Sequence, residues 1–152
     1  MQSSGITPNA DCATEFGKLK DSKAYRYTVM KITADYKNVE VITDDCTPPE
    51  GSCEEDWKKF AEMCTGKYAN EPIYAAFDFQ WEAEDGHTST KILFVTWVPE
   101  TAKVKAKMLT TSTKEAVKRS LVGIGQDFQA TDASEITYDC ALDKCKSATT
   151  SG

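Results

Sequence analysis

The two longest apolar runs of the chain carry the pattern of β-strands. In IYAAFDFQW, alternate residues form one apolar face: Ile73, Ala75, Phe77, Phe79 and Trp81. The run KILFVTWV is apolar on both faces, which is typical of a strand in the middle of a sheet covered on both sides. The polar turn EAEDGHTST separates the two runs, and Pro99 ends the second. We therefore predict two successive strands joined by a polar turn.

Shorter runs predict further strands. YRYTVMKI alternates in the way of a half-buried strand, and the turn ADYKN leads from it to VEVIT, so the two form a predicted hairpin. The segment CTPPEG is a loop, because two prolines and a glycine stop regular structure. DFQA, near the C-terminus, is a short strand candidate.

Helical spacing marks the two ends of the chain. A first helix is predicted from Asp11 to about Lys20, with Asn9 or Asp11 as its cap. A short last helix is predicted to start between Asp132 and Tyr138, and the tail ATTSG is expected to be disordered.

A capping box, in which Ser52 and Glu55 lie three residues apart, predicts the start of a further helix. Its apolar face follows at helical spacing: Cys53, Trp57, Phe60, Ala61 and Cys64. Strands flanked by helices, with one fully apolar strand, predict an α/β fold of the α+β type: one mixed sheet with helices on both faces.

The segment KVKAKMLTTSTKEAVKR is strongly basic although the chain carries a net charge of -6. Against the single acid Glu115 it holds six basic residues: Lys103, Lys105, Lys107, Lys114, Lys118 and Arg119. We predict a helix that Gly123 closes, with a bend or break at Thr110–Thr113, where Ser112 and Glu115 make a second capping box.

If both halves of this segment run as one helix, Lys103, Lys107, Lys114 and Lys118 lie close to a single stripe. Like charges four residues apart repel each other, which is a mild cost. The pattern leaves two interpretations open: a solvated helix face, or a surface that meets an anionic partner.

Composition and charge exclude several classes of protein. A pI near 4.9 argues against a general nucleic-acid binder. No run approaches the ~18 apolar residues of a membrane span, and the start MQSSGITPNADCA lacks the basic and apolar regions of a secretory signal. His87 in a polar turn is a poor general base, and no glycine-rich phosphate loop follows a strand. We therefore expect no enzyme activity, no cofactor and no metal.

Six cysteines allow disulfides, a metal site or reduced thiols: Cys12, Cys46, Cys53, Cys64, Cys140 and Cys145. Reduced thiols acting as small apolar residues are favoured, because the chain is long enough for a core without cross-links and the spacings do not suit a metal. If any disulfide forms, the pair Cys46 and Cys53 is the best candidate, because these two residues flank the loop TPPEGS.

Several motifs together resemble the actin-depolymerising factor/cofilin family. KAKMLTTSTKEAVKRSLVGIGQDFQATDASEI is similar to the family's long helix and following strand, and KILFVTWVPETAKVKAKM to the strand and turn that precede that helix. IYAAFDFQW and the N-terminal SSGIT match in the same order, so the likeness runs from about Ser4 to Lys146.

The resemblance implies a single ADF-homology domain over residues 1–152, structured from about 4 to 146, with a five- to six-stranded mixed sheet. It further implies a monomeric, cytoplasmic protein of the actin cytoskeleton. Such a protein would bind actin monomers and filaments, prefer the ADP form, sever filaments and promote depolymerisation, without a cofactor. Phosphoinositides are a further candidate ligand.

The resemblance also assigns residues to two surfaces. Monomer-binding positions are Ser4, Gly5, Ile6, Lys105, Lys107, Met108, Asp132 and Glu135. Filament-binding positions are Lys91, Asp143, Lys144 and Lys146. Ser4, with Ser3 as the alternative, is the expected site of inhibitory phosphorylation.

One departure bears on function: the turn before the central strand reads HTSTK and keeps only Lys91 of the usual basic residues. A monomer binder with weak severing is therefore one alternative. A non-actin adaptor that binds acidic lipids or another protein through the basic helix is the other.

Overall fold

The computed structural model describes residues 5–147. The strands in that range are β1 (Thr7–Pro8), β2 (Tyr27–Ile32), β3 (Asn38–Val41), β4 (Ile73–Glu82), β5 (Thr88–Trp97) and β6 (Gln126–Ala130). The helices are α1 (Ala10–Lys20), α2 (Cys53–Thr65), α3 (Val104–Ser120) and α4 (Tyr138–Ser147), with a short 3₁₀ turn η1 at Thr43–Asp45.

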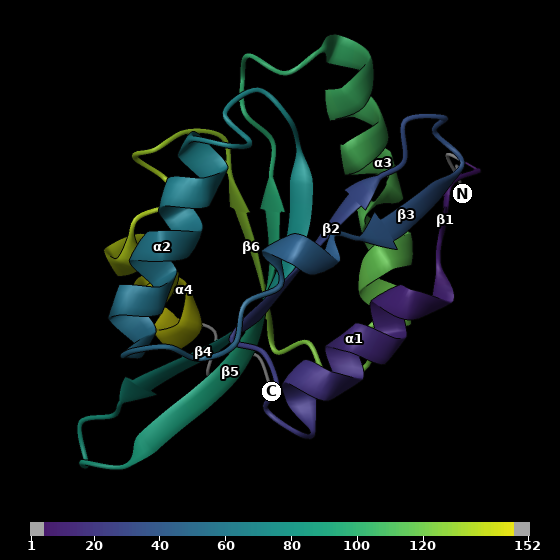
Figure 1. The fold of residues 1–152 in the computed structure, drawn as a ribbon. Helices are drawn as coiled ribbons and strands as arrows, with labels where there is room; N and C mark the ends of the chain where they lie inside the picture. Colours follow the sequence, from purple (N-terminus) through teal and green to yellow (C-terminus); the bar gives the residue numbers. More distant parts are fainter. Residues whose placement is uncertain (1–4, 148–152) are drawn as a thin grey trace.

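The six strands form one mixed sheet in the order β1-β3-β2-β4-β5-β6. The pairs β2–β3, β2–β4 and β4–β5 are antiparallel, whereas β1–β3 and β5–β6 are parallel. Figure 1 shows α1 and α3 on one face of the sheet and α2 and α4 on the other. The predicted fold class, a single mixed sheet with helices on both faces, is confirmed.

Each face of the sheet has its own apolar core. On the α2 and α4 side, Trp57 is fully buried and its ring makes an edge contact with Phe77 at 4.8 Å between centroids. On the α1 and α3 side, Phe94 stacks on Tyr74 at 5.7 Å. Because β4 and β5 send large side chains to both cores, they bind the two helical layers together, as the predicted pattern for β5 requires.

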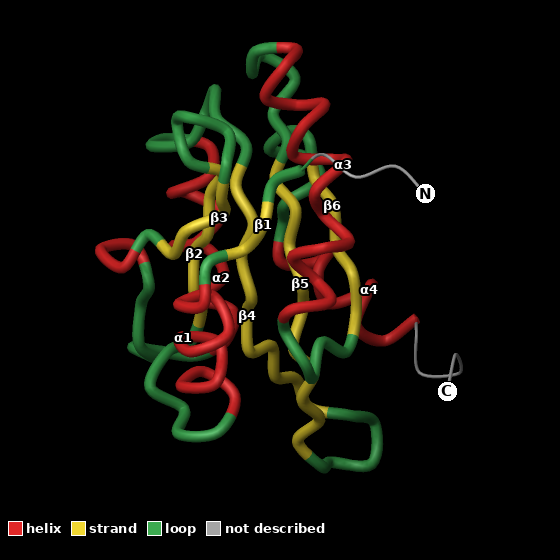
Figure 2. Tube along the Cα trace, turned by 90° about the vertical axis from the view of Figure 1, so that its right-hand side faces the viewer, coloured by secondary structure: helices red, strands yellow, loops and turns green. Residues whose placement is uncertain are grey.

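The β4–β5 hairpin is longer than the sequence pattern predicted. β5 begins at Thr88 rather than at Lys91, because Thr88 pairs with Glu82 of β4 and continues the ladder. The turn itself is limited to residues 83–87 and contains His87, whose side chain is 84% exposed and lies 3.1 Å from Asp85. The far end of this hairpin projects from the rest of the sheet, at the bottom of Figures 1 and 2.

The predicted bend in the basic helix is wrong, because α3 is one continuous helix of 17 residues. Thr110 and Thr113 face the sheet and are buried, and the Tyr74 hydroxyl donates a hydrogen bond to the carbonyl of Thr110 at 2.5 Å. Ser112 does not cap a second helix; its hydroxyl donates to the Leu109 carbonyl at 3.3 Å. Packing against the sheet thus outweighs the poor helix propensity of this stretch.

The other helix ends lie closer to their predicted positions. The capping box is confirmed: the Ser52 hydroxyl accepts from the Glu55 amide, and the Glu55 carboxylate accepts from the Ser52 amide. α1 begins at Ala10, and Asn9 stands at its cap position without a side-chain capping bond. α3 ends at Ser120, and Gly123 lies in the loop beyond it with φ 120°.

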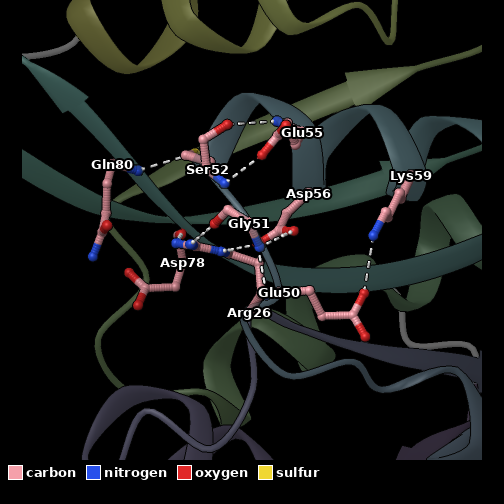
Figure 3. A network of polar contacts seen from close by, with 10 residues as sticks. Arg26, Glu50, Gly51, Ser52, Glu55, Asp56, Lys59, Asp78 and Gln80 are labelled. Atoms are coloured by element: carbon pink, nitrogen blue, oxygen red, sulfur yellow. Dashed lines mark hydrogen bonds and ion pairs between the residues drawn. The ribbon is translucent and has the colours of Figure 1, made fainter.

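A buried polar network holds the loop between β3 and α2, where the sequence expected irregular structure (Figure 3). The Arg26 guanidinium donates to the Asp56 carboxylate at 2.8 Å and to the carbonyls of Gly51 and Asp78, both at 3.3 Å. Asp56 also accepts from the backbone amides of Glu50 and Gly51. Arg26, which directly precedes β2, therefore joins β4, α2 and this loop.

All six cysteines are free thiols in the described part of the chain. Cys46 and Cys53, the pair singled out above, each accept a backbone hydrogen bond instead, from Val29 at 3.4 Å and from Gln80 at 3.3 Å. Burial raises the pKa of the Cys12 thiol to about 12 and that of Cys46 to about 11. Buried thiols of this kind are protonated and inert near neutral pH.

Candidate partner-binding surface

The N-terminal half of α3 is positively charged. Lys103 stands at the cap position, and Lys105 and Lys107 follow in the first turn, which contains no acid. Among residues 5–147, none of these three lysines takes part in an ion pair. A helix N-terminus already carries partial positive charge, so three lysines there oppose the helix dipole. An anionic partner docked at this end would remove that repulsion.

Two of these lysines are held in place by loops. The Lys105 ammonium lies 4.6 Å from the centre of the Tyr36 ring, which belongs to the β2–β3 turn. The Lys107 ammonium donates to the Glu100 carbonyl at 3.1 Å, in the loop between β5 and α3, and Lys107 is half-buried. Lys105 is exposed.

An exposed apolar pair lies between the lysines. Val104 and Met108 are 68% and 65% exposed, and a spacing of four residues puts them on one helix face. By helical geometry Lys105 and Lys107 flank this pair on opposite sides. Met108 was predicted as a contact, whereas Val104 was missed. Helical spacing could have identified Val104, because it places this residue on the side of α3 opposite to the buried Val117.

The C-terminal half of α3 is different, which corrects the predicted stripe. Lys114 and Lys118 both contact the Asp127 carboxylate of β6, at 2.9 and 3.3 Å. Their side chains are only 17% and 28% exposed. These two lysines share the one Asp127 carboxylate and are largely buried, so the exposed lysines without an ion pair are concentrated at the N-terminal end of the helix.

The N-terminal arm runs beside α3. β1 contacts α3 and pairs with β3, and the Thr7 amide donates to the Lys37 carbonyl at 3.2 Å. Ile6, predicted as a contact, is 4% exposed and packs in the core on the α1 and α3 side, so its side chain anchors the arm. Gly5 is exposed with φ 78°. Ser3 and Ser4 lie outside the described residues.

Asp132 and Glu135 are exposed in the loop between β6 and α4, and both shape that loop. The Asp132 carboxylate accepts from the Ser134 hydroxyl and the Ser134 and Glu135 amides, and the Ser134 hydroxyl bond lowers its pKa. Glu135 accepts from the Thr131 amide at 2.7 Å. A cavity of about 250 Å³ lies between this loop and the loop that precedes α3. The structure thus places the β6–α4 loop and the N-terminal half of α3 at one end of the molecule (Figure 1).

The predicted filament-binding residues gather at the end of α4. The Lys91 ammonium donates to the Cys145 carbonyl at 2.9 Å, so this bond joins β5 to the end of α4. Asp143, Lys144 and Lys146 are exposed on α4. Because α4 covers the face of the sheet opposite to α3, the two predicted surfaces are separate (Figure 1).

Within residues 5–147, no group of three or more His, Cys, Asp or Glu side chains is placed to hold a metal ion. No helix of the described chain combines the length and apolar character needed to cross a membrane.

Known proteins of one family match this chain over nearly its full length. A family model described as cofilin/tropomyosin-type actin-binding protein matches residues 5–146. The chain is 38% identical over 151 residues to cofilin of Gibberella zeae, with 93% of this chain and 94% of the relative covered. It is 36% identical over 143 residues to actophorin of Acanthamoeba castellanii, with 94% and 96% covered. A solved cofilin from Streptomyces griseoflavus has a TM-score of 0.79 at 28% identity, with 94% and 98% covered.

Proposed function

Because this chain belongs to the actin-depolymerising factor/cofilin family, we propose that it binds actin, with the N-terminal half of α3 at the centre of the contact surface. One observation carries the proposal: Lys105 and Lys107, which form no ion pair within residues 5–147, flank the exposed pair Val104 and Met108 at a helix N-terminus that has no acid in its first turn. This combination suits an acidic partner that also offers an apolar pocket.

The residues have distinct roles in this proposal. Lys105 and Lys107 supply complementary charge and speed the encounter with an acidic surface. Met108 and Val104 supply apolar contact, and methionine adapts its shape to the partner. Gly5, Asp132 and Glu135 extend the same end of the molecule, with Gly5 on the arm beside α3. Phosphoinositides would compete for the same lysines.

The finer activities rest on the second surface. We propose that the protein binds filaments through Lys144 and Lys146, with Asp143 beside them, and promotes severing and depolymerisation of ADP-actin in the cytoplasm without catalysing a covalent reaction. Severing is expected to be weak, because Lys91 is bound to the end of α4 and the hairpin turn holds His87 as its only basic residue. Monomer binding would then dominate.

The test uses two matched double variants of α3. Lys105→Ala/Lys107→Ala removes two charges at the proposed surface, and Lys114→Ala/Lys118→Ala removes two charges that are already paired with Asp127. We expect the first to weaken binding to labelled ADP-actin monomers by roughly tenfold or more with an unchanged Tm. The second is expected to lower the Tm, because Asp127 loses both cations, and to leave the affinity nearly unchanged.

Equal effects of the two variants on affinity would contradict this location of the surface. Co-sedimentation with filaments at low and moderate salt separates the functional alternatives. A protein that pellets and also raises the unpolymerised fraction supports filament turnover, and a soluble complex with monomer alone supports a monomer binder. Absence of actin binding at both salt concentrations would reject the proposed function in favour of an adaptor.

A further inference from the structure

The turn between β2 and β3 holds an aromatic residue in an unusual backbone conformation. Tyr36 has φ 61° and is 37% exposed. A left-handed conformation is uncommon for a residue other than glycine, and it costs free energy that the surrounding structure must offset.

Hydrogen bonds around the turn define the position of Tyr36. Its amide donates to the Thr33 carbonyl at 2.9 Å. The Asp35 carboxylate accepts from the Thr33 hydroxyl at 2.5 Å and from the Lys37 amide at 3.1 Å. The Asn38 amide in turn donates to the Thr33 hydroxyl at 3.2 Å. The turn is therefore braced on both sides of Tyr36, and its ring projects from a fixed base.

The Lys105 ammonium lies 4.6 Å from the centre of the Tyr36 ring, and a groove lies beside this contact. A hollow of about 540 Å³ separates the turn from α3, lined on one side by Ala34 and Tyr36 and on the other by Lys103, Ala106 and Leu109. Among residues 5–147 the Tyr36 ring is the only partner of the Lys105 ammonium. Its negative face attracts the cation, which the positive end of α3 would otherwise repel.

We propose that Tyr36 is a positioning residue that orients Lys105 for actin, and that the β2–β3 turn is therefore part of the actin-binding surface. The inference rests on the proposed function. A free lysine side chain loses considerable rotamer entropy when a partner immobilises it. Contact with the ring restricts Lys105 before actin arrives, so less entropy is lost on binding and the affinity rises.

Two substitutions separate the ring from the backbone. Tyr36→Gly removes the ring and suits the left-handed backbone, so the turn is kept. Tyr36→Phe keeps the aromatic face. Lys23→Gly is the matched control, because Lys23 has a similar φ of 58° and precedes β2, whereas Tyr36 follows it. We expect Tyr36→Gly to weaken ADP-actin binding about threefold, and the phenylalanine and control variants to bind as the parent does.

A double-mutant cycle distinguishes positioning from a general structural role. In a Lys105→Ala background Tyr36→Gly is expected to cause no further loss of affinity, because its effect passes through Lys105. A second readout needs no actin: the ring current of Tyr36 should shift the side-chain methylene protons of Lys105 upfield in NMR spectra. That shift should persist in Tyr36→Phe and vanish in Tyr36→Gly.

Three results would overturn the inference: parent-like affinity of Tyr36→Gly, an equal loss with and without Lys105, or failure of Tyr36→Phe to restore binding. In each case the parent protein and Lys105→Ala still report on the proposed function, so the two failures are distinguishable. If the parent itself does not bind actin, both the proposed function and this inference are rejected.

Discussion

Replacement of Arg26 by methionine should destabilise the fold strongly without touching the proposed actin surface. The Arg26 and Asp56 side chains are only 8% and 3% exposed. Methionine fills similar space but leaves the Asp56 carboxylate buried with only the backbone amides of Glu50 and Gly51 as donors (Figure 3). It also leaves the carbonyls of Gly51 and Asp78 without the guanidinium.

Removal of one member of a buried ion pair typically costs about 3–5 kcal/mol, because the remaining charge is left uncompensated. For a chain of this length each kcal/mol lowers the Tm by about 2–4 °C, so the expected fall is roughly 6–20 °C. Arg26→Met/Asp56→Leu, which removes both charges, should recover part of this loss, since an apolar pair avoids the desolvation of two ions.

Urea unfolding followed by tryptophan fluorescence and circular dichroism measures the free energy of unfolding for each variant. Lys59→Ala is the control, because the Lys59–Glu50 pair is exposed at the edge of the same network and its loss should not be measurable. Actin affinity at a temperature where Arg26→Met remains folded should match the parent. A loss below about 1 kcal/mol for Arg26→Met, or an equal loss in the double variant, would refute this reasoning.

Further predictions concern the N-terminus, the hairpin and the thiols. Ser4→Asp should weaken actin binding several-fold at constant Tm while Ser4→Ala stays active, because a negative charge on the arm opposes an acidic partner; phosphate, with about -1.5 to -2 charges, should act more strongly. Full activity of enzymatically phosphorylated protein would exclude the switch. Thr88→Lys/Ser89→Lys should raise filament co-sedimentation and severing without changing monomer affinity; no response in single-filament microscopy would reject the hairpin as a filament contact. Burial raises the pKa of Cys12 and Cys145 from 9.0 to about 12, so the folded state keeps protons that the unfolded chain loses. The free energy of unfolding should therefore fall as pH rises from about 9 toward 12, and Cys12→Ala should reduce this slope in urea titrations.

The family resemblance pointed to α3, but only the tertiary structure shows which of its lysines form ion pairs. Met108 and Lys105 lie on the exposed side of α3, in agreement with the resemblance. Lys114 and Lys118 look the same in the sequence, yet both form ion pairs with Asp127. A charge pattern along one helix does not reveal which carboxylates a neighbouring strand brings to it.

Local patterns determined most of the elements by themselves. The period of two in β4 and the capping box at Ser52 depend only on residues a few positions apart, so both could be predicted from the sequence alone. The orientation of the β4 side chains toward the α2 layer follows from the same alternation.

Only the tertiary structure decided the features that join distant segments. α3 is continuous through its threonine-rich middle because Tyr74 bonds this stretch and the sheet buries Thr110 and Thr113 within it. Lys91 is bound to a carbonyl 54 residues away, and Lys105 meets Tyr36 because the β2–β3 turn reaches the start of α3. Local propensity depends on neighbours in the chain, whereas these contacts depend on which elements the fold sets side by side. That physical difference separates what could be read from the sequence from what could not.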